Sequence, residues 1–267
     1  MELSYILADP SGNTTVFVLS PVSSADYGPV ARKVMEQLNA EQVAFVHHDR
    51  MDMMGGEFCG NASRSFALWQ ALHLPDGRSL KPLQGALAQT VCVSGAPHPL
   101  KVTLRGDGSD VYHASIAMPL PLRMLPLEDP FLGACTLVEY PGISHLVLEH
   151  RTPHEDDPAA AQRLLAGLKA QDSCFGLLYL EGNSLRPRVL VRDTGTDVWE
   201  SSCASGTCAV AAALSLRQNA SLTLELSQPG GSLSACATVS DGKLTALTLD
   251  GPVTFPKAGL LNLPQRP

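Results

Sequence analysis

The alternation of apolar and polar residues predicts the same order of elements in each half of the chain. In the first half, strand-like runs at 4–10 and 14–22 precede an amphipathic helical pattern over 24–40. A further strand, a cysteine-containing loop, a helix over 62–74 and three alternating runs complete that half. The second half repeats strands, helix, strands, cysteine loop, helix and a strand meander. We therefore predict an α+β fold built from two units of one plan.

A proline-rich segment, 118–130, separates the two halves and is interpreted as a crossover. It divides a predicted N-terminal α+β domain, 1–118, from a C-terminal α+β domain, 119–255, and the tail 256–267 is expected to pack back on the first domain. A chain of 267 residues is long enough for two modest domains, each with its own core.

Composition and charge exclude several classes of partner. The net charge is −7, and the 19 Lys and Arg residues form no basic run, which argues against nucleic-acid binding. No stretch approaches the ~18 apolar residues of a membrane span, and the first residues lack the features of a secretion signal. We expect a cytoplasmic protein that acts on a small molecule.

The seven cysteines are expected to be free thiols, because their number is odd and no secretion signal is recognised. No CxxC pair is present, so no metal site is predicted. Cys208 is expected about one turn inside a helix, in the core. Two other cysteines stand out by their surroundings.

These two, Cys59 and Cys203, lie in the segments GEFCGNASRSFAL (56–68) and ESSCASGTCAVAAAL (200–214), among small residues before an apolar helical run. A helix start carries unpaired N–H groups that bind a carboxylate. Its partial positive charge is expected to lower the pKa of a nearby thiol. We expect Asn61 or Ser63 to cap the first helix, and the residues after Cys203 to offer the same chemistry.

Two such loops predict inversion of a stereocentre by two bases. If the helix starts face each other across a cleft, both grip an α-carboxylate and place one sulfur on each side of Cα. A thiolate on one face removes the Cα proton and a thiol on the other face delivers one. Configuration then inverts without a cofactor.

Four motifs resemble those of the diaminopimelate epimerase-like family of cofactor-independent amino-acid racemases and epimerases, and the resemblance covers nearly the whole chain. They are PSGN (10–13), EFCGNASR (57–64), ESSCASGT (200–207) and QPGGSL (228–233). The resemblance implies two pseudo-symmetric domains, each a strand-rich sheet or barrel wrapped around a central helix, with the active site in the cleft between them. It also implies Cys59 and Cys203 as the catalytic pair, with no cofactor and no metal.

The same resemblance implies the residues that hold the substrate. Backbone amides in the two cysteine loops bind the carboxylate, and Glu200 pairs with the ammonium group. The full set expected to bind substrate is Asn13, Gly60, Asn61, Glu200, Ser205, Gly206 and Thr207. A monomer or homodimer is expected.

Departures from the family pattern indicate the substrate. Ser201 stands where diaminopimelate epimerases have an arginine for the distal carboxylate, and 143–145 read Ile-Ser-His in place of Asn-Pro-His. Without these groups the site cannot neutralise a second amino-acid head group, so diaminopimelate is disfavoured. The motifs together are most similar to the histidine racemases of staphylopine-type metallophore synthesis. Histidine is predicted as substrate, with another neutral amino acid or diaminopimelate as the alternative.

Two other classes remain open on the sequence. A thiol hydrolase needs one cysteine with a histidine base, and an amino-acid-binding protein on a racemase scaffold needs no catalysis at all. His145 matches a family histidine, for which core packing and a contact with the catalytic loop are equally compatible with the sequence.

Overall fold

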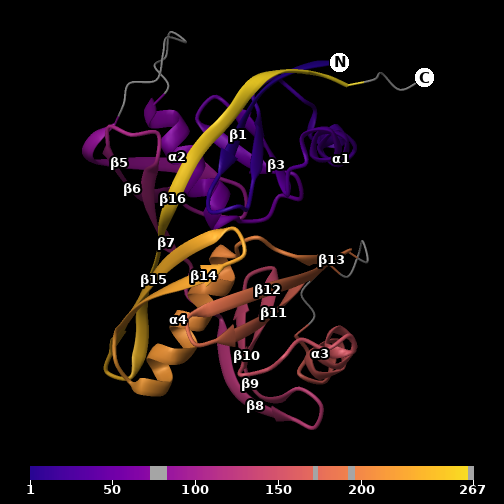
Figure 1. The fold of residues 1–267 in the computed structure, drawn as a ribbon, viewed down its shortest axis with the longest axis vertical. Helices are drawn as coiled ribbons and strands as arrows, with labels where there is room; N and C mark the ends of the chain where they lie inside the picture. The colour runs from indigo at the N-terminus through magenta and orange to yellow at the C-terminus, as the bar shows by residue number, and fades with distance from the viewer. Residues whose placement is uncertain (73–82, 171–173, 192–195, 264–267) are drawn as a thin grey trace. The chain divides into compact units, whose positions relative to one another are not determined.

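The computed structural model describes residues 1–72, 83–170, 174–191 and 196–263, and the chain forms two compact units. Unit 1 comprises Met1–Ala117 and Asp250–Pro267, and unit 2 comprises Met118–Leu249 (Figure 1). The chain enters unit 1 for the second time within β16 (Lys243–Asn262), a strand that continues without interruption past the boundary.

Unit 1 follows the predicted order of elements, with one additional strand, β4 (Arg50–Met53), where the sequence predicted the start of the cysteine loop. Its elements are β1 (Glu2–Asp9), β2 (Thr15–Val18), a 3-10 turn (Ser24–Asp26), α1 (Tyr27–Leu38), β3 (Gln42–His47), β4, α2 (Gly60–Leu72), β5 (Gln84–Val93), β6 (Leu100–Asp107) and β7 (Tyr112–Met118). The strands neighbour one another in this order, and β16 pairs with β1. The predicted helix over 62–74 is observed up to Leu72, and the last two positions lie outside the described residues.

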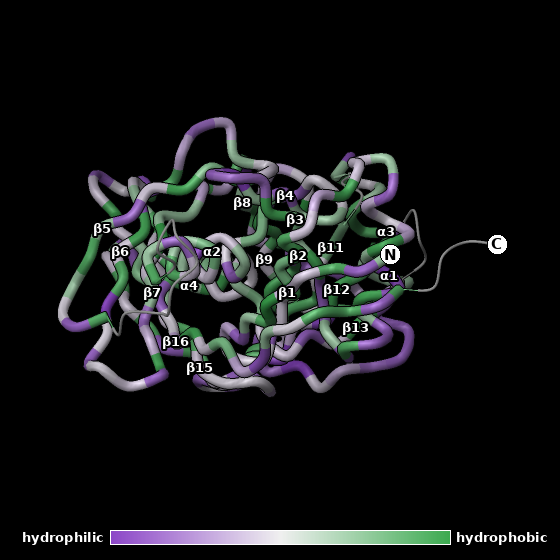
Figure 2. The backbone as a smooth tube through the Cα atoms, turned by 90° about the horizontal axis from the view of Figure 1, so that it is seen from above, coloured by the Kyte–Doolittle hydropathy of each residue, from purple (hydrophilic) through white to green (hydrophobic). Residues whose placement is uncertain are grey.

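The buried strands of unit 1 are those with continuous apolar runs. β2 and β3 pair in parallel, and every side chain of β2 is buried. Strands covered on both faces are uniformly apolar rather than alternating, and Figure 2 shows both as hydrophobic stretches. α1 packs on β3 through one apolar face and ends where Asn39 adopts a left-handed conformation with φ of 50°.

Unit 2 repeats the plan. Its elements are β8 (Arg123–Asp129), β9 (Gly133–Tyr140), β10 (Ile143–Glu149), α3 (Asp157–Gly167), β11 (Cys174–Glu181), β12 (Ser184–Val191), β13 (Thr196–Trp199), α4 (Ala204–Gln218), β14 (Leu222–Gln228) and β15 (Gly231–Ser240). The strand order is β15-β14-β12-β11-β10-β9-β8, and β13 pairs with β12. The predicted α+β class is confirmed.

The proline-rich segment 118–130 is not the plain crossover that the sequence indicated. Residues 123–129 form β8, which pairs antiparallel with β9 from Arg123↔Glu139 to Asp129↔Gly133. β8 is the last strand of its order, so Pro126 needs no ladder partner on its other side. An edge strand therefore tolerates Pro126, and the other prolines of the segment lie outside β8.

α2 and α4 are the central helices of their units. α2 packs on β5, β6 and β1, and α4 packs on β15, β14 and β10 (Figure 1). Most of their side chains are buried and many are small, which is typical of a helix enclosed on all sides. The starts of both helices are therefore positioned by the interior of their own unit.

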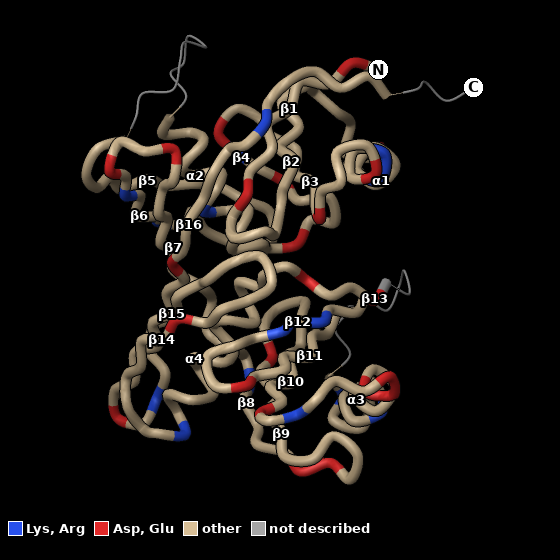
Figure 3. The backbone as a smooth tube through the Cα atoms, viewed as in Figure 1, with Lys and Arg blue, Asp and Glu red and all other residues tan. Residues whose placement is uncertain are grey.

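Charges of both signs are mixed along the described residues. Figure 3 shows Lys and Arg scattered among Asp and Glu in both units. Over the part of the chain that the structure describes, every helix falls short of the length and apolar character that a membrane crossing needs.

We expect Arg64→Leu to lower the free energy of unfolding by about 2–4 kcal/mol, because a buried network loses its donor. The guanidinium of Arg64 is fully buried, and its Nη1 donates to the carbonyls of Gly251 at 2.7 Å and Pro252 at 2.9 Å. Urea denaturation followed by circular dichroism measures the change.

Arg105→Leu is the matched control, since Arg105 is about half exposed and pairs at 2.7 Å with Asp250 of β16, the strand that also carries Gly251 and Pro252. An exposed ion pair contributes at most about 1 kcal/mol. Equal losses in the two variants would contradict the structural role of Arg64.

Candidate active site

α2 begins directly after Cys59, and the cysteine itself takes the capping position. The Ala62 N–H donates to Cys59 Sγ at 3.4 Å. Ser63 donates twice to the Cys59 carbonyl, through its N–H at 2.9 Å and its hydroxyl at 2.7 Å. The expectation that Asn61 or Ser63 caps the helix is therefore wrong, because Gly60 is already its first residue.

α4 begins with the same contacts around Cys203. The Gly206 N–H donates to Cys203 Sγ at 3.4 Å. Thr207 donates to the Cys203 carbonyl through its N–H at 3.0 Å and its hydroxyl at 2.7 Å. The local environment predicted to occur twice is confirmed by this correspondence. Since the Thr207 hydroxyl fixes the loop, a contact between Thr207 and substrate stays a prediction.

The structure brings three predicted site residues of unit 1 together: Asn13, Cys59 and Asn61. Asn13 Oδ1 accepts from Asn61 Nδ2 at 3.1 Å and from Gln42 Nε2 at 2.7 Å. Gln42 Nε2 also lies 3.4 Å from Cys59 Sγ. Gln42 thus joins the Asn13 turn to the thiol.

Sequence reasoning missed Gln42. Its signal was a polar residue at the first position of a strand whose next four residues are apolar, QVAFVH. The position in the sequence does not predict which residue Gln42 contacts, because its contacts depend on the parallel pairing of β2 with β3.

Gln228 holds the cysteine loop of unit 2. Its Oε1 accepts from the Cys203 N–H at 2.8 Å, and its Nε2 donates to Thr207 Oγ1 at 2.9 Å. Gln228 belongs to the QPGGSL motif, whose turn the sequence singled out without giving this side chain a role. The motif therefore positions the second thiol from a neighbouring strand.

His145 contacts the cysteine loop through Ser205. The His145 Nε2 and Ser205 Oγ are 2.9 Å apart, and Ser205 Oγ lies 3.6 Å from Cys203 Sγ. His145 is completely buried, and burial lowers its pKa to about 3. A neutral imidazole therefore orients Ser205, which resolves the choice between plain packing and a contact with the loop.

The Cys203 thiol is not acidified in the way the sequence indicated. Burial raises its pKa well above the ordinary value, and the charge and hydrogen bond of Glu200 raise it further. Hydrogen bonds from Ser205 and the Gly206 N–H act in the opposite direction. The predicted lowering is wrong for Cys203, because desolvation outweighs the field of the helix start.

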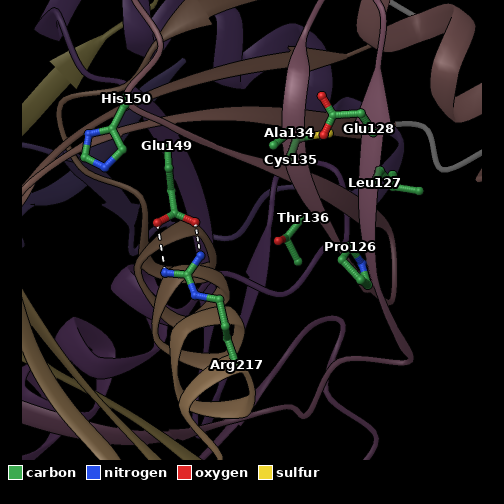
Figure 4. Close-up of a pocket in the computed structure, with 9 residues that line it drawn as sticks. All are labelled: Pro126, Leu127, Glu128, Ala134, Cys135, Thr136, Glu149, His150 and Arg217. Atoms are coloured by element: carbon green, nitrogen blue, oxygen red, sulfur yellow. Dashed lines mark hydrogen bonds and ion pairs between the residues drawn. The ribbon is translucent and has the colours of Figure 1, made fainter.

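A groove of about 630 Å³ on unit 2 is a separate feature (Figure 4). The Glu149–Arg217 ion pair at 2.5 Å lies in its lining, and Cys135 is its only lining thiol. Burial and the carboxylates Asp129 and Glu128 raise the pKa of Cys135 to about 11, so this thiol is a poor nucleophile. The groove contains no predicted site residue.

No group of three or more His, Cys, Asp and Glu side chains is placed to hold a metal ion within the four described stretches of chain. Among the described residues, no cysteine forms a disulfide.

Sequence comparison identifies relatives over nearly the whole chain. Residues 2–261 match the family described as "Histidine racemase CntK N-terminal domain". A histidine racemase of Fusobacterium nucleatum subsp. nucleatum is 31% identical over 221 residues, 78% of this chain and 79% of that protein. A histidine racemase of Staphylococcus aureus is 25% identical over 244 residues, 84% of this chain and 85% of that protein. The predicted resemblance is confirmed.

Solved structures share the fold at low identity. A predicted epimerase from Pseudomonas aeruginosa gives a TM-score of 0.65 at 15% identity, over 98% of this chain and 100% of that chain. A hydroxyproline epimerase from Agrobacterium vitis gives a TM-score of 0.59 at 11% identity, over 97% and 92% of the two chains.

We expect Gly206→Ala to lower the free energy of unfolding by about 1–3 kcal/mol, because the added carbon overpacks the cysteine loop. A Cβ at this position lies 2.7 Å from Leu178 Cδ2 and 3.2 Å from Cys203 Sγ. Gly28→Ala in α1 is the control, since its Cβ meets nothing within 4 Å. Urea denaturation should show the control unchanged or up to about 1 kcal/mol more stable. Equal behaviour of both variants would refute the packing argument.

We expect stability to fall on acidification through His145. Its folded pKa of about 3 lies below the unfolded value of about 6.5. Between these values only the unfolded chain binds the proton, so stability is full above about 6.5 and falls toward pH 3, by at most about 1.4 kcal/mol per pH unit.

His145→Gln should remove this one-proton component of the pH dependence while keeping a side chain that can hydrogen-bond Ser205. Free energies of unfolding in urea at pH 7, 6 and 5 measure the slope for both proteins. An equally steep slope in the variant would contradict the assignment.

Proposed function

The chain belongs to the histidine racemase family, and on that premise we propose that it is a cofactor-independent racemase that interconverts L- and D-histidine. Histidine racemase is the name of relatives from two genera, at 31% and 25% identity. The single observation that carries the proposal is the pair of cysteine-capped central helices, because a two-base inversion needs two thiols in matched settings.

In the proposed mechanism, Cys59 and Cys203 act from opposite faces of Cα. One sulfur removes the Cα proton as a thiolate, and the other delivers a proton as a thiol. The first N–H groups of each helix have no acceptor within the helix, so those of Gly60 and Asn61 in α2, and of Ser205 and Gly206 in α4, hold the substrate carboxylate. Binding there fixes the stereocentre between the sulfurs.

The energetic demand sets a further requirement. A Cα–H is a weaker acid than a thiol by on the order of ten pKa units, which corresponds to about 14 kcal/mol. Positioning contributes about 7–11 kcal/mol at best, and helix-end electrostatics are strong only in a dry cavity. We therefore propose that the reacting groups are closed off from water when substrate is bound.

Side-chain specificity follows from the residues beside the second loop. Ser201 replaces the arginine that would meet a second carboxylate, and its carbonyl accepts from the Gly230 N–H at 2.8 Å. A neutral substrate side chain such as imidazole fits a site without that cation. Glu200 is proposed to pair with the ammonium group, and Asn13 to line the pocket. A cytoplasmic location and a monomeric or homodimeric state stay predictions from the sequence.

A thiol hydrolase is disfavoured by the surroundings of His145. Such an enzyme needs the imidazole as a base on the nucleophilic sulfur. Here the imidazole bonds to Ser205, and burial holds its pKa at about 3, so it is a weak base. The Cys203 loop therefore lacks the ion pair that activates a cysteine nucleophile.

We expect the enzyme to racemise L-histidine in deuterated water and to incorporate deuterium at Cα. Chiral chromatography measures the racemisation, and mass spectrometry measures the deuterium. Cys59→Ser and Cys203→Ser should each lower racemisation by a factor of at least about 10²–10⁴, the range for loss of a positioned acid or base. Cys236→Ser, which changes a free cysteine in β15, should leave the rate unchanged.

Two results would overturn the assignment. Exchange with diaminopimelate and not with histidine would refute the substrate. Full turnover in Cys203→Ser with none in Cys59→Ser would favour one-nucleophile chemistry instead.

A further inference from the structure

The two cysteines have matched backbones but unequal side-chain neighbours. Cys59 Sγ receives the Ala62 N–H and the Gln42 amide, both at 3.4 Å. Cys203 Sγ receives the Gly206 N–H at 3.4 Å and lies beside Ser205 and the Glu200 carboxylate. One sulfur therefore faces an added neutral donor, and the other faces an anion.

A chain of hydrogen bonds determines which end of the Gln42 amide faces Cys59. An ionised carboxylate only accepts, so Glu41 Oε2, 2.6 Å from Asn13, requires the Nδ2 end of that amide. Asn13 Oδ1 then points to Gln42 and requires its Nε2 end at 2.7 Å. The NH₂ group of Gln42 is thereby the end that reaches Cys59.

The second proton of the Gln42 amide has two possible acceptors. Thr15 Oγ1 lies at 3.0 Å and Cys59 Sγ at 3.4 Å from Nε2. A charged acceptor binds a donor about twice as strongly as a neutral one. A thiolate at Cys59 therefore draws this proton more strongly than a thiol does, and the amide stabilises the charged form.

Charged groups reinforce the difference between the sites. The guanidinium of Arg64 is completely buried, and burial lowers its pKa to about 10 against the opposing influence of Asp250 and Cys59. A positive Arg64 and a negative Cys59 thus stabilise each other. Asp250 also pairs with Arg105 at 2.7 Å, and Glu41 accepts from Asn13 at 2.6 Å.

We infer that Cys59 is the thiolate in the resting enzyme, that Gln42 is the positioning residue that stabilises this charge, and that Cys203 rests as the thiol. The inference rests on the proposed function and deepens it by giving the two sulfurs their starting roles. Burial and Glu200 raise the pKa of Cys203, in agreement with its role as the proton donor.

These roles give the reaction a direction. Cys59 S⁻ takes the proton from Cα, and the C–H electron pair stays on the substrate. Cys203 S–H then delivers its proton to the opposite face and becomes the thiolate. After the product leaves, a proton moves from Cys59 to Cys203 through water and restores the resting form. One enantiomer therefore reacts with the resting enzyme directly, and the other reacts with the reversed form.

Thiolate absorbance at 240 nm of the substrate-free full chain, titrated from pH 5 to 9.5, tests the assignment. At pH 7 the wild-type signal should be lost in Cys59→Ser and retained in Cys203→Ser. Loss in Cys203→Ser alone, or no thiolate in the wild type, would overturn it. Because no substrate is used, this outcome is independent of whether histidine is racemised.

Gln42→Leu tests the positioning role, because it keeps the side-chain size and removes the donor. The midpoint of the Cys59 thiolate signal should rise by about one pH unit, corresponding to one charge-assisted hydrogen bond. In Glu41→Gln the side chain at position 41 can donate as well as accept, so it no longer fixes the orientation of the Asn13 amide. The midpoint of the Cys59 thiolate signal should therefore also rise, but by less than in Gln42→Leu.

Gln89→Leu is the matched control in unit 1, since that amide donates to Gln70 at 3.4 Å, and it should leave the midpoint unchanged. An unchanged midpoint in both Gln42→Leu and Glu41→Gln would refute the role of Gln42. A purely structural role would lower stability in these variants without moving the midpoint.

Discussion

A cysteine sulfur that caps a buried helix is the contact on which the rest of this structure depends. The first N–H groups of a helix need acceptors, and Ser, Asp or Asn usually provide them with a strong hydrogen bond. Sulfur is a weak acceptor, and its bonds here are 3.4 Å long at both Cys59 and Cys203. Each helix start is therefore ordered by its cap and keeps its capacity to bind an anion.

The two helix starts have the same backbone geometry, but the side chains around their cysteines differ in charge. Ser63 and Thr207 make equivalent bonds to the cysteine carbonyls, so the loops have one geometry. The Glu200 carboxylate lies beside the Cys203 thiol, whereas the Gln42 amide donor lies beside the Cys59 thiol. In the proposed two-base inversion, equivalent geometry serves the two faces of Cα and unequal charge separates base from acid.

The fold by itself does not decide the chemistry. A predicted epimerase and a hydroxyproline epimerase have this fold at 15% and 11% identity, and function depends on the site that a fold carries. For this chain we propose that the decisive residues are the two cysteine loops and the neutral Ser201. The groove between β8, β9 and Arg217 shows that a thiol in a hollow does not by itself make a site. Burial and acidic neighbours keep its one thiol, Cys135, protonated.

The sequence by itself determined the order of elements, the α+β class and the two cysteine loops, because periodicity, glycine turns and helix starts are local properties of the chain. Tertiary structure alone decided which residues surround each sulfur. Gln42 reaches Cys59 across 17 positions, Gln228 reaches Cys203 across 25, and Arg64 bonds to a carbonyl 187 residues away. Desolvation of Cys203 likewise comes from packing on all sides. The acidity of a thiol depends on these distant neighbours and on its distance from water, and a local pattern encodes neither.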